Sequence, residues 1–362
     1  MRRLAIVLLA LSLFGAACGD DNGTTSAAST APSGTTKTNA PVTITLLTHD
    51  SFAVSDGLLA GFTEQTGITV KVLQAGDAGE MVNKAILTKD RPLGDVLFGV
   101  DNTFLTRAVD AGIFEPYTSP GLSEVDEQFA DDTASGAVTP IDFGDVCLNY
   151  DKAYFGKHEL PPPTSLESLT KPEYKDLLVV ENPATSSPGL AFMLGTIAEF
   201  GEEGWLDYWK QLEANGVSVS SGWEDAYYTQ FSGSSGKGPK PIVVSYASSP
   251  PAEVVFAETP LSEAPTAAVP TTCFRQIEFA GVLAGTKHPE AAKAFIDFML
   301  STTFQNDMPL NMFVYPVNTK AVLPDEFVKY STVPDKPLLL TPDEIAANRD
   351  KWIDEWTSTV LG

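Results

Sequence analysis

The stretch TITLLTHDSFAVSDGLLAGFTEQTGITVKVL, Thr43 to Leu73, decides the expected fold. It begins with a short apolar strand at Thr43–Leu47, and a helix with an apolar face follows and ends at Gly67. A second strand then runs over Ile68–Leu73. Strands that alternate with helices form parallel sheets covered by helices, so the stretch predicts an α/β fold.

The same alternation continues along the chain. A second amphipathic helix lies around Met81–Ile86, and a third strand covers Asp95–Val100. Asn102 is the predicted N-cap of the next helix, and Gly112 lies just past its end. In such sheets a ligand binds beyond the carboxyl ends of the strands.

Polar side chains follow each of these three strands. Because the carboxyl ends of parallel strands meet at one edge, we expect these groups to face one crevice. Capping of the following helices is the competing explanation for Asp50, Asp77 and Asn102 taken singly. The expected crevice residues are His49, Asp50, Ser51, Asp77, Asp101 and Asn102.

The middle of the chain, residues 143–272, has strands and helices of its own and predicts a second α/β lobe. One of its strands ends in the hydroxyl-rich turn Thr185–Ser187, which leads into a helix. Free N–H groups at a helix N-terminus bind anions or polar head groups, although simple capping by Ser187 also explains the turn.

The C-terminal region returns to helices. Thr341 and Glu344 form a predicted capping box, and Trp352 and Trp356 share the buried face of that helix. Phe313 precedes this helix, on a loop whose apolar residues follow neither the helical nor the strand period. It either lines a cleft or packs in the interior of the protein.

The first residues indicate export. Residues 1–18 combine two arginines, an apolar run and a small-residue end, which is typical of a signal segment. Cys18 then stands where a lipidated cysteine would, with ordinary signal cleavage as the alternative. Residues 19–40 have no large apolar side chain, so we expect a disordered tether. An exported lipoprotein would touch the membrane only through its anchor.

The remaining 41–362 are long enough for two lobes: 41–142 in lobe 1, 143–272 in lobe 2, and 273–362 as a crossover strand and return to lobe 1 with C-terminal helices. The formal charge of −24 disfavours nucleic acid and anionic lipid as partners and favours a cationic ligand, although solubility at an exposed cell surface explains most of these charges equally well.

Two more cysteines, Cys147 and Cys273, lie far apart in sequence and in apolar contexts. Outside the cytoplasm such a pair is more often a disulfide than a metal site. Both lie at the segments where the chain is expected to cross between the lobes, 140–145 and 273–279. A disulfide there would link the two crossover strands covalently.

Catalytic motifs are missing from the sequence. The chain has three histidines and contains no HExxH, GxSxG, CxxC or GxGxxG pattern, so we expect neither an enzyme nor a cofactor or metal. A carboxylate-dependent glycosidase remains an alternative, because that chemistry needs only two acids. A cleft that closes on a small solute by a hinge motion explains more of the features.

Over nearly all of 42–361 the chain resembles the thiamine-binding periplasmic proteins of ABC importers. The stretches that carry the resemblance include DSFAVSDG from Asp50, TSSPGLAFM from Thr185, SGWEDAYYTQF from Ser221, VVSYASSP from Val243 and FQNDMPLNMFVYPVN from Phe304. The resemblance implies a two-lobed type II periplasmic-binding-protein fold, each lobe a mostly parallel sheet flanked by helices. It also implies a monomer that delivers thiamine or its phosphate esters to a membrane permease.

The resemblance also implies roles for single residues. Asp77 matches an acid that contacts the ligand, Trp223 a stacking aromatic, Tyr246 a further aromatic wall, and Ser186 or Ser187 the polar turn. The chain departs from the family at His49 and Phe313, where the relatives carry tyrosine and tryptophan. Another cationic solute, a polyamine or ferric iron, is therefore the alternative ligand.

The stretch SGWEDAYYTQF carries the densest aromatic surface. If a helix begins at Trp223, Tyr227 shares its cleft-facing side. The other residues are expected to pack, in the case of Tyr228 and Phe231, or to complement the helix dipole, in the case of Glu224 and Asp225.

Overall fold

The structure, a computed structural model, describes residues 42–130 and 133–362. The predicted signal segment, the tether and the lipidation of Cys18 lie outside the described residues. Residues 40–362 are a single unit by their internal contacts. Within the described ranges, no helix has both the length and the apolar character needed to cross a membrane.

The regular elements follow the predicted alternation. The strands are β1 (Val42–Thr48), β2 (Ile68–Gln74), β3 (Val96–Asp101), β4 (Phe114–Glu115), β5 (Thr139–Asp151), β6 (Leu178–Glu181), β7 (Ser218–Ser220), β8 (Ile242–Tyr246), β9 (Thr266–Ala268), β10 (Phe274–Leu283) and β11 (Tyr315–Pro316). The α-helices are α1 (Leu58–Thr66), α2 (Ala78–Leu87), α3 (Leu105–Asp110), α4 (Glu127–Ala130), α5 (Lys152–His158), α6 (Ser187–Ala214), α7 (Pro250–Val255), α8 (Pro289–Leu300), α9 (Thr302–Gln305), α10 (Met308–Asn311), α11 (Asp325–Tyr330) and α12 (Pro342–Val360). Short 3₁₀ turns cover Pro120–Glu124, Leu166–Thr170, Pro172–Tyr174 and Pro270–Thr272, and a π-helical turn covers Asp225–Gln230.

One sheet runs through the unit in the order β2-β1-β3-β10-β5-β8-β6-β7. At one end β1 pairs in parallel with β2 and β3, and we call these three strands the first half-sheet. At the other end β6 pairs in parallel with β7 and β8, which together form the second half-sheet. The parallel α/β groups predicted from the sequence are thus confirmed.

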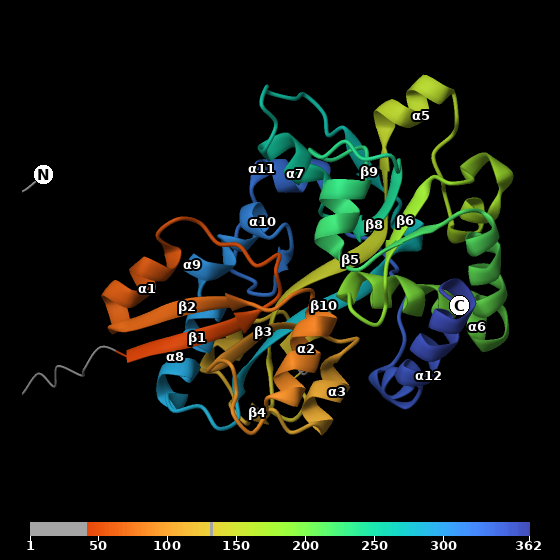
Figure 1. The fold of residues 1–362 in the computed structure, drawn as a ribbon. Coiled ribbons are helices and arrows are strands. Elements are labelled where there is room, and N and C mark those ends of the chain that lie inside the picture. Colours follow the sequence, from red (N-terminus) through yellow and green to blue (C-terminus); the bar gives the residue numbers. More distant parts are fainter. Residues whose placement is uncertain (1–41, 131–132) are drawn as a thin grey trace, which may run out of the picture. The chain divides into compact units, whose positions relative to one another are not determined.

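Two long antiparallel strands, β5 and β10, join the half-sheets (Figure 1). One side of β10 pairs with β3 of the first half-sheet. The far end of β5 pairs with β8 of the second, where Val146 lies opposite Tyr246. These two strands contain the segments where the sequence predicts a hinge.

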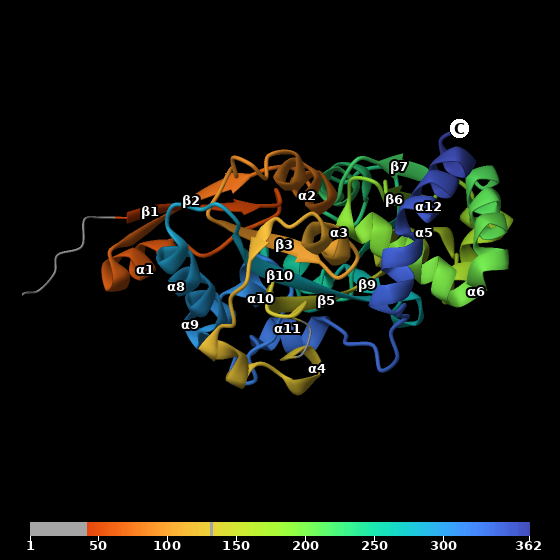
Figure 2. The same ribbon diagram turned by 90° about the horizontal axis from the view of Figure 1, so that it is seen from below.

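Helices cover both faces of the first half-sheet. In Figure 2, α1 and α8 lie below β1 and β2, and α2 lies above them. The ring of Phe62 in α1 packs against Phe295 and Phe298 of α8, with centroids 5.4 and 4.8 Å apart. These contacts place the apolar face predicted for α1 against the core, where Phe62 is buried.

The C-terminal helix α12 packs against α6. Trp356 meets Trp209 edge to face at 5.3 Å, and both Trp352 and Trp356 are buried, which confirms their predicted core role. The predicted capping box of Thr341 and Glu344 is also confirmed. α12 therefore lies beside the chain expected to form lobe 2.

The prediction that Asn102 caps a helix is wrong. Helix α3 begins at Leu105, after Phe104 at the N-cap position. The Asn102 side chain instead donates to the carbonyl of Arg275 at 3.2 Å and accepts from the N–H of Ile277 at 3.0 Å. An amide carries both a donor and an acceptor, so it extends the ladder to β10 rather than capping a helix.

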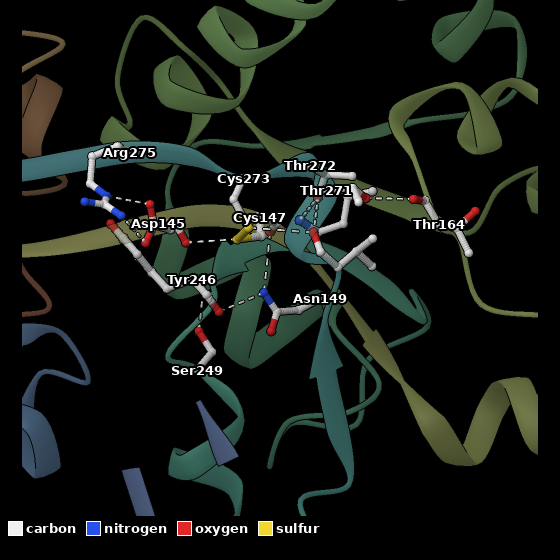
Figure 3. Close-up of a disulfide and its surroundings, with 12 residues drawn as sticks. Asp145, Cys147, Asn149, Thr164, Tyr246, Ser249, Thr271, Thr272, Cys273 and Arg275 are labelled. Atoms are coloured by element: carbon white, nitrogen blue, oxygen red, sulfur yellow. Dashed lines mark hydrogen bonds and ion pairs between the residues drawn. A yellow bond between two sulfur atoms is a disulfide. The ribbon is translucent and has the colours of Figure 1, made fainter. Parts of the chain in front are cut away.

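The two cysteines of the described region are joined in a disulfide between Cys147 of β5 and Cys273, which precedes β10 (Figure 3). Beside it the guanidinium of Arg275 pairs with the carboxylate of buried Asp145, with Nε and Oδ1 2.6 Å apart. A covalent bond and an ion pair thus hold the two connecting strands together.

Candidate functional site

A cavity of about 310 Å³ opens where the carboxyl ends of the two half-sheets face each other. Its walls come from both sides. The loop after β1 and the start of α2 contribute from the first half-sheet, and the start of α6, the π-helical turn and β8 contribute from the second. This is the place at which α/β sheets bind ligands.

Asp77 connects the two sides of the cavity. As predicted by the capping explanation, it is the N-cap of α2, and its carboxylate accepts from the N–H of Ala78 at 2.6 Å. The same carboxylate also accepts from the N–H of Ser187 at 3.2 Å and from that of Trp223 at 2.9 Å, on the opposite side. Burial raises the pKa of Asp77, and these backbone donors act in the opposite direction.

The hydroxyl-rich turn before α6 meets α2 across the cavity. The carbonyl of Thr185 accepts from the N–H of Glu80 at 3.2 Å. Ser187 lines the cavity, whereas Ser186 is fully buried and does not line it. The carbonyl of Ser186 accepts the first helical bond of α6, from the N–H of Leu190. Of the two predicted serines, the structure therefore places only Ser187 on the wall.

Aromatic side chains form the wall on the side of the second half-sheet. The rings of Trp223 and Tyr227 stack at 5.0 Å with planes 17° apart, and both line the cavity. The indole Nε1 donates to the hydroxyl of Ser245 at 2.9 Å, which fixes the orientation of the Trp223 ring. Tyr246 meets Trp223 edge to face at 6.4 Å and lines the cavity as expected.

Tyr228 was predicted to pack, but the structure places it on the cavity wall, 39% exposed. The physical reason is the π-helical turn, closed by the N–H of Phe231 donating to the carbonyl of Ala226. Its wider turn lets the side chains four and five residues after Trp223 share one face. Phe231 is buried, as predicted.

Phe313 lies at the far rim of the cavity. It lines the cavity and pairs with Phe256, whose ring centroid is 5.6 Å away. Its backbone has a φ of 55°, which a bulky residue rarely adopts, and its carbonyl accepts from the hydroxyl of Ser248 at 2.5 Å. The sequence allowed two interpretations of Phe313, that it lines a cleft or that it packs in the interior. The structure shows that it lines the cavity.

Carboxylates dominate the charge of the cavity. Asp50, Asp77, Glu224 and Glu278 all line it, together with Ser51 and His49. Glu224 was expected only to complement a helix dipole, and Glu278 was not predicted at all. Burial raises the pKa of Asp50 and Glu224, and it raises that of Glu278 to about 7.

His49 is electrically neutral at physiological pH, because burial lowers its pKa to about 4. Its Nε2 atom lies 3.7 Å from Oε1 of Glu278. Across the β5–β10 ladder Glu278 lies opposite Asp142, and burial followed by the charge of Glu278 raises the pKa of Asp142 well above its usual value.

Asp101 was expected in the crevice, but it is fully buried and does not line the cavity. Its Oδ1 accepts from the N–H of Thr103 at 2.6 Å. This local bond turns the carboxylate back toward its own chain. Burial raises the pKa of Asp101 to about 7.

No pattern in the sequence indicated Glu278 as a wall residue. The strand-end rule finds polar groups where parallel strands stop, whereas Glu278 lies within the antiparallel strand β10. Its position in the predicted crossover segment is the only feature that could have indicated it.

Known proteins with the same organisation provide an independent comparison. The profile of the family described as bacterial extracellular solute-binding protein matches residues 91–336. The thiamine-binding periplasmic protein of Escherichia coli K12 is 30% identical over 88% of this chain and 93% of its own length. That of Brucella suis is 30% identical over 87% of this chain and 91% of its own length.

A solved structure titled periplasmic thiamin binding protein superposes with a TM-score of 0.76, at 28% identity, over 88% of this chain and 96% of its own. The fold is the type II periplasmic-binding-protein fold, as predicted. The profile spans more than half of the chain, and the curated relatives cover most of it. The chain therefore belongs to the family of bacterial extracellular solute-binding proteins.

Proposed function

We propose that the chain is the solute-binding component of an ABC importer and captures thiamine in this cavity. Thiamine has a permanently positive thiazolium ring and a flat aminopyrimidine. The observation that carries the proposal is the stacked pair Trp223 and Tyr227, 5.0 Å apart, in a cavity that also contains four carboxylates. An aromatic face beside negative charge is the chemistry that recognises an organic cation.

The residues that line the cavity have different proposed roles. Trp223 and Tyr246 supply faces for stacking, and Tyr227, only 1% exposed, supports the Trp223 ring by stacking against it. Asp50 and Glu224 supply negative charge. Asp77 has its oxygens engaged by the backbone N–H groups of Ser187 and Trp223, so it holds the cavity closed as well as contributing charge. His49, Ser51, Ser187 and Phe313 complete the proposed ligand shell.

We further propose that the two half-sheets form lobes with the boundaries given from the sequence, and that β5 and β10 are the hinge between them. Closure would then form the bonds from Asp77 to Ser187 and Trp223, which span the cavity. The monomeric state, the lipid anchor at Cys18 and delivery to a membrane permease belong to the same proposal.

The other solutes considered from the sequence have less support in the geometry. Among the described residues, no group of three or more histidine, cysteine or acidic side chains is arranged to hold a metal ion. Of the adjacent tyrosines, Tyr227 donates its hydroxyl to Glu253 at 3.0 Å, and burial followed by that acid raises its pKa well above normal. A ferric site would require the deprotonated phenolate.

Isothermal titration calorimetry of the purified protein with thiamine, spermidine and ferric citrate tests the proposal. We expect saturable heat with thiamine, at one site per chain, and weaker or no heat with the other two. Absence of heat with thiamine would refute the thiamine assignment. Saturable heat with spermidine or iron alone would assign the cavity to that solute.

A further inference from the structure

The loop of residues 232–240, SGSSGKGPK, follows the π-helical turn and folds back against it, and we call it the glycine loop. Its donors bond carbonyl groups of the turn. The hydroxyl of Ser234, 3% exposed, donates to the carbonyl of Tyr227 at 2.5 Å. The N–H of Lys240 donates to the carbonyl of Gln230 at 2.8 Å. The last carbonyls of a helix have no partner within it, so the glycine loop supplies bonds that the turn itself lacks.

Two glycines let this loop lie directly against the backbone of the turn. A side chain at Gly236 would overlap the carbonyl oxygen of Tyr228, and one at Gly238 would overlap the carbonyl group of Gln230. Neither glycine has a positive φ, so the close approach of two backbones, rather than an unusual conformation, requires them. A larger residue at either position would therefore push the loop and the turn apart.

The turn held in this way carries Tyr228 onto the cavity wall. The Tyr228 ring meets Trp223 and Tyr227 edge to face, with centroids 5.4 and 5.3 Å apart. In an α-helix a residue five positions after Trp223 would lie about 140° around the axis from it. A π-helical turn is rare and frequently marks a functional site. The position of Tyr228 therefore depends on the wider turn, and the turn is bonded by the glycine loop.

We propose that Tyr228 contacts the bound ligand and that the glycine loop is the element that positions it. This inference rests on the proposed function, in which the ligand is thiamine. The planes of the Tyr228 and Trp223 rings are 79° apart, so Tyr228 adds a second aromatic surface that borders a flat cation stacked on Trp223. The glycine loop does not line the cavity itself, so it acts on the ligand through the turn.

Calorimetric titration with thiamine tests the contact. Tyr228→Ala should weaken binding by about fivefold or more, because it removes an aromatic contact to the cation. Saturable heat with the wild type together with an unchanged dissociation constant in Tyr228→Ala would overturn the inference and leave the proposed function intact. Absence of heat with the wild type would overturn the proposed function, and the inference with it.

Gly236→Ala tests the role of the glycine loop. The added methyl group should displace the turn and weaken thiamine binding by about fivefold or more, as the loss of Tyr228 does. Gly94→Ala is the matched control, because its methyl group would lie 2.9 Å from the carbonyl oxygen of Thr45, which is also a tight backbone contact. Gly94 does not line the cavity, so its substitution should leave the dissociation constant unchanged. Equal weakening by both variants would assign the effect to general destabilisation and overturn the positioning role.

Ser234→Ala keeps the positioning role testable if Gly236→Ala does not fold, because it adds no atoms to the loop. It removes the bond to the carbonyl of Tyr227 and should weaken thiamine binding by about threefold or more. In the Tyr228→Ala background it should have no further effect on binding, whereas it should lower the free energy of unfolding in both backgrounds. A purely structural role would affect binding equally in both backgrounds, and that result would overturn the positioning of Tyr228 by the glycine loop.

Discussion

Oδ2 of Asp77 accepts a hydrogen bond from the backbone N–H of Trp223 at 2.9 Å. Asp77 caps the first helix after β2, whereas Trp223 begins the aromatic wall more than a hundred residues later. The Asp77 side chain thus connects the start of α2 on one side of the cavity with the aromatic residues on the other side. In the proposed hinge motion, this bond forms only in the closed state.

The Asp77→Asn variant should therefore weaken thiamine binding by about tenfold or more. An asparagine amide has one oxygen, so its NH₂ group must face either the N–H of Ser187 or that of Trp223, and a donor facing a donor costs about 1 to 3 kcal/mol. The free energy of unfolding should change less, because asparagine is as good an N-cap as aspartate and, by the proposed hinge motion, the ligand-free protein opens and leaves both N–H groups to water. Calorimetry measures the first effect and chemical denaturation the second.

Asp151→Asn is the matched control for this variant. Asp151 is also a buried N-cap, of α5, and accepts from the N–H of Ala153 at 2.9 Å, but it does not line the cavity. Its substitution should leave the dissociation constant unchanged. An effect of the same size from both variants would mean that capping, rather than the bridge across the cavity, controls binding.

Trp223→Ala should weaken thiamine binding by about tenfold or more. A desolvated contact between a cation and an aromatic face contributes about 2 kcal/mol, and the indole also positions Tyr227 by stacking. Trp223→Phe keeps an aromatic face but loses the hydrogen bond to Ser245, so it should lie between the wild type and the alanine variant. Both dissociation constants come from calorimetry, and wild-type affinity in Trp223→Ala would show that the ligand stacks elsewhere.

The sequence located the cavity but only part of its wall. Strand ends indicated His49, Asp50 and Asp77 correctly as cavity neighbours, because parallel strands always end at one edge. Tyr228 was misplaced, since a helical period of 3.6 residues puts it on the other side of the helix, and only a π-helical turn brings it beside Tyr227. Asp101 was misplaced because its local bond to Thr103 depends on a side-chain rotamer that periodicity does not determine.

Removal of the disulfide should destabilise the protein without abolishing the cavity. The bond between Cys147 and Cys273 closes a loop with a sequence separation of 126. Crosslinks of this kind contribute about 2 to 5 kcal/mol, so the double variant Cys147→Ser with Cys273→Ser should unfold at lower denaturant concentration. Chemical denaturation measures the shift.

Reduction of the wild-type protein provides the control for that double variant. Wild-type protein denatured in the presence of dithiothreitol should approach the midpoint of the variant, because both lack the crosslink. A variant whose midpoint equals that of the oxidised protein would show that the disulfide adds nothing to stability.

Thiamine binding should become weaker as the pH falls from 8 to 6. Glu278 lines the cavity with a pKa of about 7, raised first by burial and then by the nearby acids Asp101 and Asp77. A cation binds the ionised carboxylate, so below pH 7 binding must also remove a proton, at a cost of up to about tenfold in affinity for each pH unit. Calorimetry over this range should show the decline, and Glu278→Gln should flatten it.

Protonation of Glu278 weakens binding but stabilises the fold. This difference distinguishes the predicted decline in affinity from a general loss of structure at low pH. The pKa of Glu278 is raised above its unfolded value, so its contribution to stability is fully present below about pH 4.5 and is lost as the pH rises through about 7. Asp142 lies opposite Glu278 and has a raised pKa as well, while His49 stays neutral across the range because its pKa is about 4. At pH 6 the ligand-free protein should therefore gain resistance to unfolding from this pair while its affinity for thiamine declines. Two results together would assign the decline in binding to another group. Affinity and stability would both fall between pH 8 and 6, and the thiamine affinity of Glu278→Gln would decline as steeply as that of the wild type.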